Sequence, residues 1–171
     1  MASLRSWLGL DRRDTSAPDV SALRDTLDVL DHMEPARARF LAAFAYILGR
    51  VAHADREVSP EEAAAMEAAV RAEGQLTPEQ AMVVVQLAKT NNLLFGGTAD
   101  FLVAREFNAV ASYEQKMTLM RCLFAVAASD ARISVAEEGE LHRIANELRI
   151  DRNDLVTLRV AHGRHLPGLG R

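Results

Sequence analysis

Two short acidic motifs with the same residue pattern lie far apart in this chain. The pattern Asp-x-x-(Val/Ile)-Ser-x-x-Glu runs from Asp55 to Glu62 and returns 75 positions later, from Asp130 to Glu137. Carboxylate oxygens are the ligands that hard cations such as Ca²⁺ and Mg²⁺ take in proteins. If the two motifs meet in the fold, the four carboxylates of Asp55, Glu62, Asp130 and Glu137 would form a site for a divalent cation.

The same residues also have a purely structural interpretation. Ser59 and Ser134 each stand three positions before the Glu of their motif, which is the spacing of a capping box at a helix start. Such a cap contributes about 1 kcal/mol to helix stability and needs no ligand. The first motif is also not an EF-hand loop, because Pro60 stands where that loop requires Gly. A cation site and an acidic structural turn therefore both remain open.

The elements that must position these motifs are predicted to be helices. Aromatic residues make up only 5% of the chain, and the alternation of apolar and polar residues that marks strands is missing. We expect an all-α fold, a compact bundle of about seven to eight helices. The apolar spacing places them at about 18–34, 36–54, 60–74, 78–88, 99–110, 113–127, 135–149 and 152–160.

Several helix ends carry recognisable signals. Thr77 and Ser112 each begin a capping box, and Asp151 opens the last helix. Gly74 is expected to end its helix in the left-handed conformation that glycine adopts readily. The helix at 36–54 has an apolar stripe wide enough for a central, buried position.

The order of helices suggests an internal duplication. Each half reads as a central helix, an acidic turn, a helix, a short capped link and a further helix, at about 36–92 and about 111–162. We expect pseudo-twofold symmetry between the halves and a link that is one residue shorter in the second. Residues 1–17 are predicted to be a flexible lead, 18–162 a single domain and 163–171 a flexible tail.

Composition and charge narrow the classes of function. The net charge is -4, and the basic residues are scattered among carboxylates, so we expect no nucleic-acid partner. The single Cys122 cannot form an intrachain disulfide and lies in an apolar run, which favours a core residue in a reducing compartment. The longest apolar run, at 40–48, is about half a membrane span, and we expect a cytoplasmic protein. An amphipathic trio, Leu4, Trp7 and Leu8, could contact a membrane surface peripherally or a partner.

One further pair of residues has a spacing that suits a metal. Glu138 and His142 lie four positions apart on a predicted helix, which is compatible with zinc binding and also with a surface ion pair. Both interpretations remain open at this point.

The duplicated motif, at the end of an apolar helix in a small helical chain, resembles the TerB-like family of tellurite-resistance proteins, shared with the N-terminal region of DjlA-type co-chaperones. The resemblance covers about residues 36–160. It implies an all-helical domain without enzymatic activity that acts in stress and metal-response assemblies. It also implies a divalent cation bound by acidic residues, which here are Asp55, Glu62, Asp130 and Glu137.

Three hypotheses for function follow. The main one is a non-catalytic TerB-like stress or metal-response module that binds a divalent cation at the acidic turns and a protein partner. The alternative is an ion-free helical adaptor that presents a groove to a partner helix. The third is a metal-dependent hydrolase that uses the acidic cluster.

Overall fold

Every regular element in the described part of the chain is an α-helix, which confirms the all-α prediction. The structure is a computed structural model that describes residues 28–52, 60–89, 100–129 and 132–163, apart from the side chains of residues 61 and 62. Residues 28–31 are helical, and seven complete helices follow: α3 (Pro35–Ala52), α4 (Pro60–Glu73), α5 (Pro78–Lys89), α7 (Asp100–Val110), α8 (Tyr113–Ala127), α9 (Val135–Glu147) and α10 (Arg152–Ala161). No described helix combines the length and apolar character that a membrane span needs.

Helix α3 is the central element, as its wide apolar stripe predicts. Its large apolar side chains are almost fully buried, among them Phe40, Leu41, Phe44, Ile47, Leu48 and Val51. The helix begins at Pro35, whose missing N–H costs nothing in the first turn. The carboxylate of Glu34 accepts hydrogen bonds from the backbone N–H groups of Ala36 at 3.0 Å and Arg37 at 2.9 Å. These two bonds lower the pKa of Glu34 and cap the helix.

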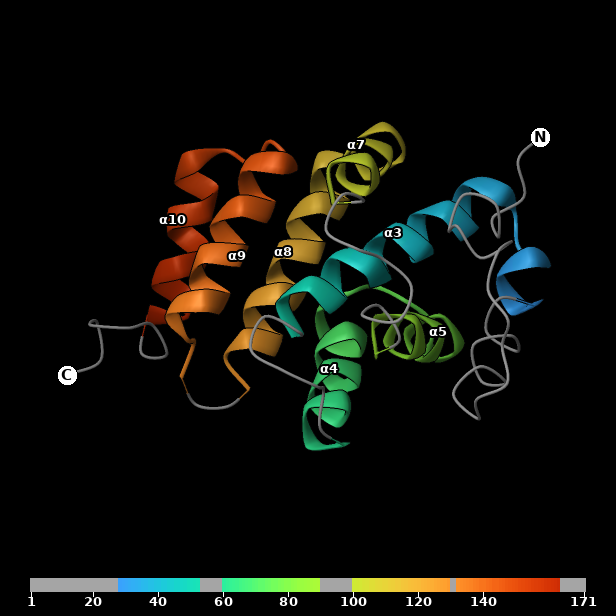
Figure 1. The fold of residues 1–171 in the computed structure, drawn as a ribbon, viewed down its shortest axis with the longest axis horizontal. Helices are drawn as coiled ribbons and strands as arrows, with labels where there is room; N and C mark the ends of the chain where they lie inside the picture. Colours follow the sequence, from blue (N-terminus) through green and yellow to red (C-terminus); the bar gives the residue numbers. More distant parts are fainter. Residues whose placement is uncertain (1–27, 53–59, 90–99, 130–131, 164–171) are drawn as a thin grey trace.

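The other helices surround α3 on several sides. In Figure 1, α8, α9 and α10 lie side by side, α3 crosses the centre, and α7 and α5 lie on opposite sides of α3. Helix α4 packs against α8 and α5, while α9 contacts both α8 and α3. The core is therefore one continuous cluster built around α3 and α8.

The predicted helix starts are confirmed wherever the structure describes them. The Oγ of Ser112 accepts from the N–H of Gln115, and the side chain of Gln115 accepts from the N–H of Ser112. Thr77 and Gln80 exchange the same pair of bonds at 3.3 and 3.4 Å. Asp151 caps α10 through the N–H of Asn153 at 2.8 Å. Short sequence patterns thus located these ends because capping depends on neighbouring residues alone.

The left-handed residue after α4 is Gln75 and not Gly74. The φ of Gln75 is 51°, and the link before α10 has its left-handed residue at Arg149, with φ 58°. Gly74 is needed for a different reason: a Cβ at this position would lie 2.3 Å from the carbonyl oxygen of Val70. The turn out of α4 therefore comes one residue later than predicted, and glycine provides the close approach before it.

The expected difference in link length was also wrong. The links at 74–77 and 148–151 have the same length, and the extra residue lies in α4, which has 14 residues where α9 has 13. The duplication and its pseudo-twofold symmetry remain predictions. The predicted lead at 1–17 and residues 164–171 of the predicted tail lie outside the described residues.

Candidate functional site

Most of the predicted cation site lies outside the described part of the structure. Asp55 and Asp130 are not among the described residues, and Glu62 is placed only as a backbone position in the first turn of α4. Glu137 is described in full. Its Oε2 accepts a hydrogen bond from the N–H of Ser134 at 2.7 Å, and Ser134 Oγ accepts from the N–H of Glu137 at 3.1 Å. The capping role of Glu137 is confirmed, and the shared cation site stays a prediction.

The described residues add no second cluster of this kind. Within residues 28–52, 60–89, 100–129 and 132–163, three or more His, Cys, Asp or Glu side chains do not come together in a way that could hold a metal ion.

A buried arginine, five positions before Asp55 in the sequence, contacts carboxylates from two other helices. Arg50, near the end of α3, has a side chain that is only 6% exposed. It lies 2.7 Å from Glu140 and 2.6 Å from Glu147, both on α9, and 3.7 Å from Asp100 at the start of α7. We call Arg50, Asp100, Glu140 and Glu147 the Arg50 cluster. It joins three helices that are distant in sequence.

Neighbouring polar groups extend the Arg50 cluster. The hydroxyl of Tyr46, one turn before Arg50, donates to Asp100 Oδ1 at 2.7 Å. The side-chain amide of Asn108 on α7 donates to the backbone carbonyl of Glu147 at 2.8 Å. Both bonds tie α7 to its neighbours, so the position of α7 depends on polar contacts as well as on apolar packing.

The electrostatics of the Arg50 cluster favour the charged guanidinium. Burial alone would lower the pKa of Arg50, but the hydrogen bond to Glu147 and the charges of Glu140, Asp100 and Glu147 outweigh it and raise the pKa. Burial and the hydrogen bond to Asp100 raise the pKa of Tyr46, which keeps its hydroxyl protonated as a donor. The guanidinium of Arg50 therefore stays charged at ordinary pH despite its burial.

The Glu138–His142 pair is not arranged as a zinc site or as an ion pair. The carboxylate of Glu138 pairs with Arg159 of α10, while His142 Nδ1 lies 3.0 Å from the backbone carbonyl oxygen of Glu138. The two side chains are thus engaged with different partners, and the four-residue spacing reflects only their shared helix face.

Cys122 is confirmed as a core residue. It is fully buried in α8, and its Sγ lies 3.8 Å from the carbonyl oxygen of Ala69 on α4. Burial, together with the charge of Glu73, raises the pKa of the thiol to about 12. The thiolate needed for nucleophilic attack is therefore not formed near neutral pH.

Cys122 should react with a disulfide reagent about a thousandfold more slowly in the native protein than in urea-unfolded chains, because reaction requires opening of the core.

The thiol pKa of about 12 exceeds its ordinary value of 9.0, so folded protein keeps a proton that the unfolded chain releases. Its contribution to the free energy of unfolding is therefore intact below pH 9 and is lost as the pH rises towards 12. Labelling rates and urea titrations from pH 8 to 11 measure both effects, and Cys122→Ala should remove this part of the pH dependence. Equal labelling of native and unfolded protein would contradict this assignment.

Comparison with known protein families places this chain in one of them. Neither a curated protein nor a solved structure matches the chain. The family model described as tellurite resistance protein TerB matches residues 41–160, from within α3 to within α10. The match includes both acidic motifs and the whole Arg50 cluster. The chain therefore belongs to the family of tellurite resistance protein TerB.

Proposed function

We propose that this TerB-family protein is a non-catalytic module of a cytoplasmic stress or metal response. In this proposal a divalent cation of the Ca²⁺ or Mg²⁺ class binds at the acidic motifs, through Asp55, Glu62, Asp130 and Glu137, and a protein partner recognises the loaded module.

The pairing of Arg50 with Glu140 is the observation that supports a shared cation site. Arg50 lies five positions before Asp55 in the chain, and Glu140 lies three positions after Glu137. Their side chains are 2.7 Å apart and mostly buried. The contact holds the last turn of α3 against α9, so the helix that precedes the first motif packs on the helix that the second motif opens.

The capping role of Glu137 is compatible with cation binding. A carboxylate offers about four lone-pair sites on its two oxygens. The hydrogen bond from Ser134 uses one site on Oε2, at 2.7 Å. The capping bond therefore does not by itself prevent the same carboxylate from ligating a cation.

Thermal unfolding with millimolar Ca²⁺, Mg²⁺ or Mn²⁺ tests the proposal. A cation that binds only the native protein, present at a free concentration of 100 times its Kd, raises the free energy of unfolding by about 2.7 kcal/mol. For a chain of this size this corresponds to a rise in Tm of roughly 5–10 °C. The double variant Asp55→Asn with Asp130→Asn should lose the shift. A matched control, Glu67→Gln with Glu106→Gln, removes two charges outside the motifs and should keep it.

Two outcomes of this experiment would exclude the cation site. One is no rise in Tm with any of the three cations. The other is an equal rise in the wild type and in the Asp55→Asn, Asp130→Asn variant. A hydrolase that uses the same cluster would additionally require turnover that this variant loses.

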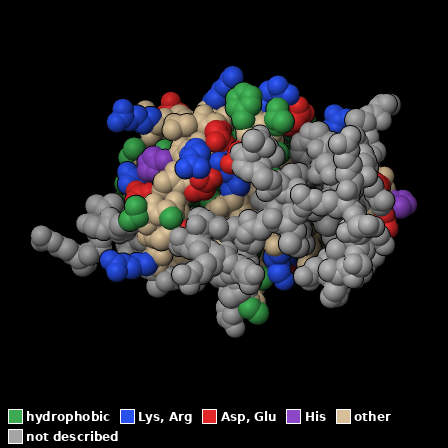
Figure 2. All heavy atoms as spheres, viewed as in Figure 1, with side chains coloured by type: hydrophobic (Ala, Val, Ile, Leu, Met, Phe, Trp, Pro, Cys, Tyr) green, Lys and Arg blue, Asp and Glu red, His purple; other side chains and the backbone are tan. Residues whose placement is uncertain are grey.

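The surface of α7 favours a second candidate, the ion-free helical adaptor. Val103, Ala104 and Phe107 face the core, while Phe101 is 70% exposed and Leu102 is 51% exposed. Figure 2 shows hydrophobic side chains gathered on the surface over α7 with basic side chains beside them. Exposed large apolar residues in a small region are typical of interaction surfaces.

The adaptor hypothesis predicts binding to a protein partner that does not depend on cations. The variant Phe101→Ser with Leu102→Ser should lose a captured partner, since these side chains would supply the apolar contact. Val156→Ser with Val160→Ser removes two exposed apolar residues of α10 and should retain that partner. Affinity capture with and without a chelator measures how much partner each variant retains. Loss of capture on chelation alone would favour the cation-dependent module instead.

A further inference from the structure

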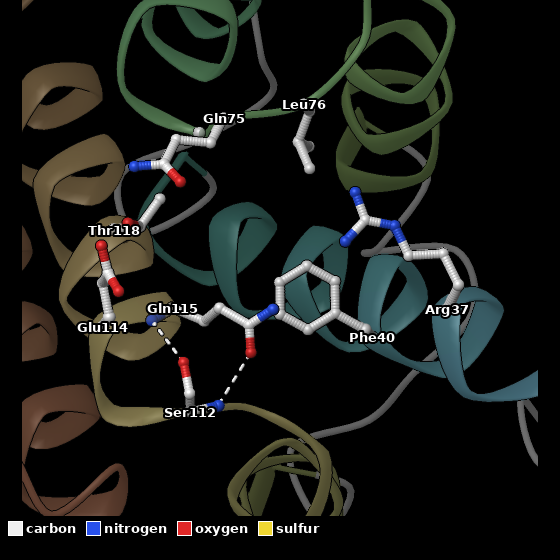
Figure 3. Close-up of a pocket in the computed structure, with 9 residues that line it drawn as sticks. Arg37, Phe40, Gln75, Leu76, Ser112, Glu114, Gln115 and Thr118 are labelled. Carbon is white, nitrogen blue, oxygen red and sulfur yellow. Dashed lines mark hydrogen bonds between the residues drawn. The ribbon is translucent and has the colours of Figure 1, made fainter.

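An open pocket lies at the N-terminal end of α3, the end away from Arg50. Its volume is about 410 Å³, within the range of roughly 300–1,000 Å³ that is common for small-molecule sites. The first turns of α3, the link between α4 and α5, and the first turns of α8 form its walls (Figure 3).

One side of the pocket carries a fixed positive charge. The guanidinium of Arg37 lies over the ring of Phe40, with Cζ 5.1 Å from the ring centroid. Its Nη2 donates to Gln80 Oε1 at 2.6 Å. In Figure 3 the guanidinium points into the pocket beside Leu76. Because Phe40 and Gln80 already hold the group, little side-chain freedom is lost when it binds a carboxylate through two parallel hydrogen bonds.

The opposite side carries acceptors and a negative charge. Figure 3 shows Gln75, Glu114 and Thr118 on the far side of the Phe40 ring from Arg37. Thr118 is 4% exposed, and its Oγ1 accepts from Arg121 Nη2 at 2.9 Å. Glu114 provides a carboxylate in the first turn of α8. The pocket therefore has opposite charges on its two sides and apolar surface from Phe40 and Leu76 between them.

We propose that this pocket binds a short peptide with free termini, two or three residues long. The peptide carboxylate binds Arg37, its N-terminal ammonium faces Glu114, and its apolar side chains contact Phe40 and Leu76. A free amino acid has both charges on one carbon, whereas Arg37 and Glu114 lie on opposite sides of the pocket (Figure 3). An extended di- or tripeptide spans up to about 7–11 Å and can make both contacts. This binding is independent of the cation proposed above.

Isothermal titration calorimetry of the full chain with trialanine tests the proposal. Trialanine should bind, and blocking either terminus, as N-acetyl-trialanine or trialanine amide, should weaken binding about tenfold or more, because each block removes one charge-assisted contact. These measurements use wild-type protein, so they do not depend on whether a variant folds.

Variants that change the protein groups test the same contacts. Arg37→Gln and Glu114→Gln should each weaken trialanine binding by a similar factor, with folding checked by circular dichroism. Arg39→Gln, at an exposed position two residues after Arg37, should leave it unchanged. Three results would overturn the proposal: no binding of trialanine at millimolar concentration, equal binding of a blocked peptide, or undiminished binding by Arg37→Gln.

Discussion

Arg50→Ala should lower the free energy of unfolding by about 3–5 kcal/mol, because it removes the buried counter-charge that Glu140 and Glu147 share. The side chains of Glu140 and Glu147 are only 12% and 21% exposed, so water cannot fully replace the lost guanidinium. Urea unfolding followed by circular dichroism measures the change. Amide hydrogens at the ends of α3 and α9 should also exchange faster in this variant, because the lost contact joins these two helices.

Arg143→Ala is the matched control for Arg50→Ala. Arg143 pairs with the same Glu140 at 2.9 Å, but its side chain is 64% exposed. Exposed ion pairs contribute about 0–1 kcal/mol, so this variant should stay near the stability of the wild type. If Arg50→Ala and Arg143→Ala lower the free energy of unfolding equally, the assignment of Arg50 as the buried centre of the ion-pair network is wrong.

Phe107→Ala should destabilise the fold by a similar amount, about 3–5 kcal/mol, because it opens a cavity where α7 meets α3. Phe107 is fully buried; its ring stacks on Phe40 at 5.3 Å and meets Phe44 edge-on at 6.5 Å. For a chain of this size the loss corresponds to roughly 6–20 °C in Tm. Differential scanning calorimetry provides the measurement.

Phe101→Ala provides the comparison on the same helix with the same change of residue. Phe101 is 70% exposed, so its truncation should alter stability by no more than about 0.5 kcal/mol. Equal losses for Phe101→Ala and Phe107→Ala would show that α7 does not pack as described.

The sequence was sufficient for the features that depend on neighbouring residues. The stripe of α3, the caps at Thr77, Ser112 and Ser134, and the start of α10 after Asp151 follow from spacing over one or two helical turns. Tertiary contact is not required to specify them, so the sequence pattern and the structure agree at these points.

The sequence was not sufficient for the Arg50 cluster, which joins positions 50, 100, 140 and 147. Two signals could have indicated it. Arg50 interrupts the apolar run of a helix predicted to be central, and a buried charge needs a partner. Glu140 and Glu147 stand seven positions apart, two helical turns, and so lie on one face of α9. Which carboxylates meet Arg50 still depends on the packing of α3 against α9.

The left-handed turn after α4 shows a different limit. Glycine is the usual residue in that conformation, but Gly74 is held by its close approach to Val70, and Gln75 adopts the positive φ. The backbone geometry at this link depends on how α4 and α5 pack together, which residue type alone does not specify.

Titration of Ca²⁺ and Mg²⁺ into the metal-free protein, followed by isothermal calorimetry, measures directly whether the two acidic motifs bind a cation. We expect saturable binding to the wild type, at least about tenfold weaker binding to the Asp55→Asn, Asp130→Asn variant, and unchanged binding to Glu67→Gln with Glu106→Gln. Absence of saturable binding to the wild type, or equal affinity in the Asp55→Asn, Asp130→Asn variant, would contradict a cation site at the two acidic motifs.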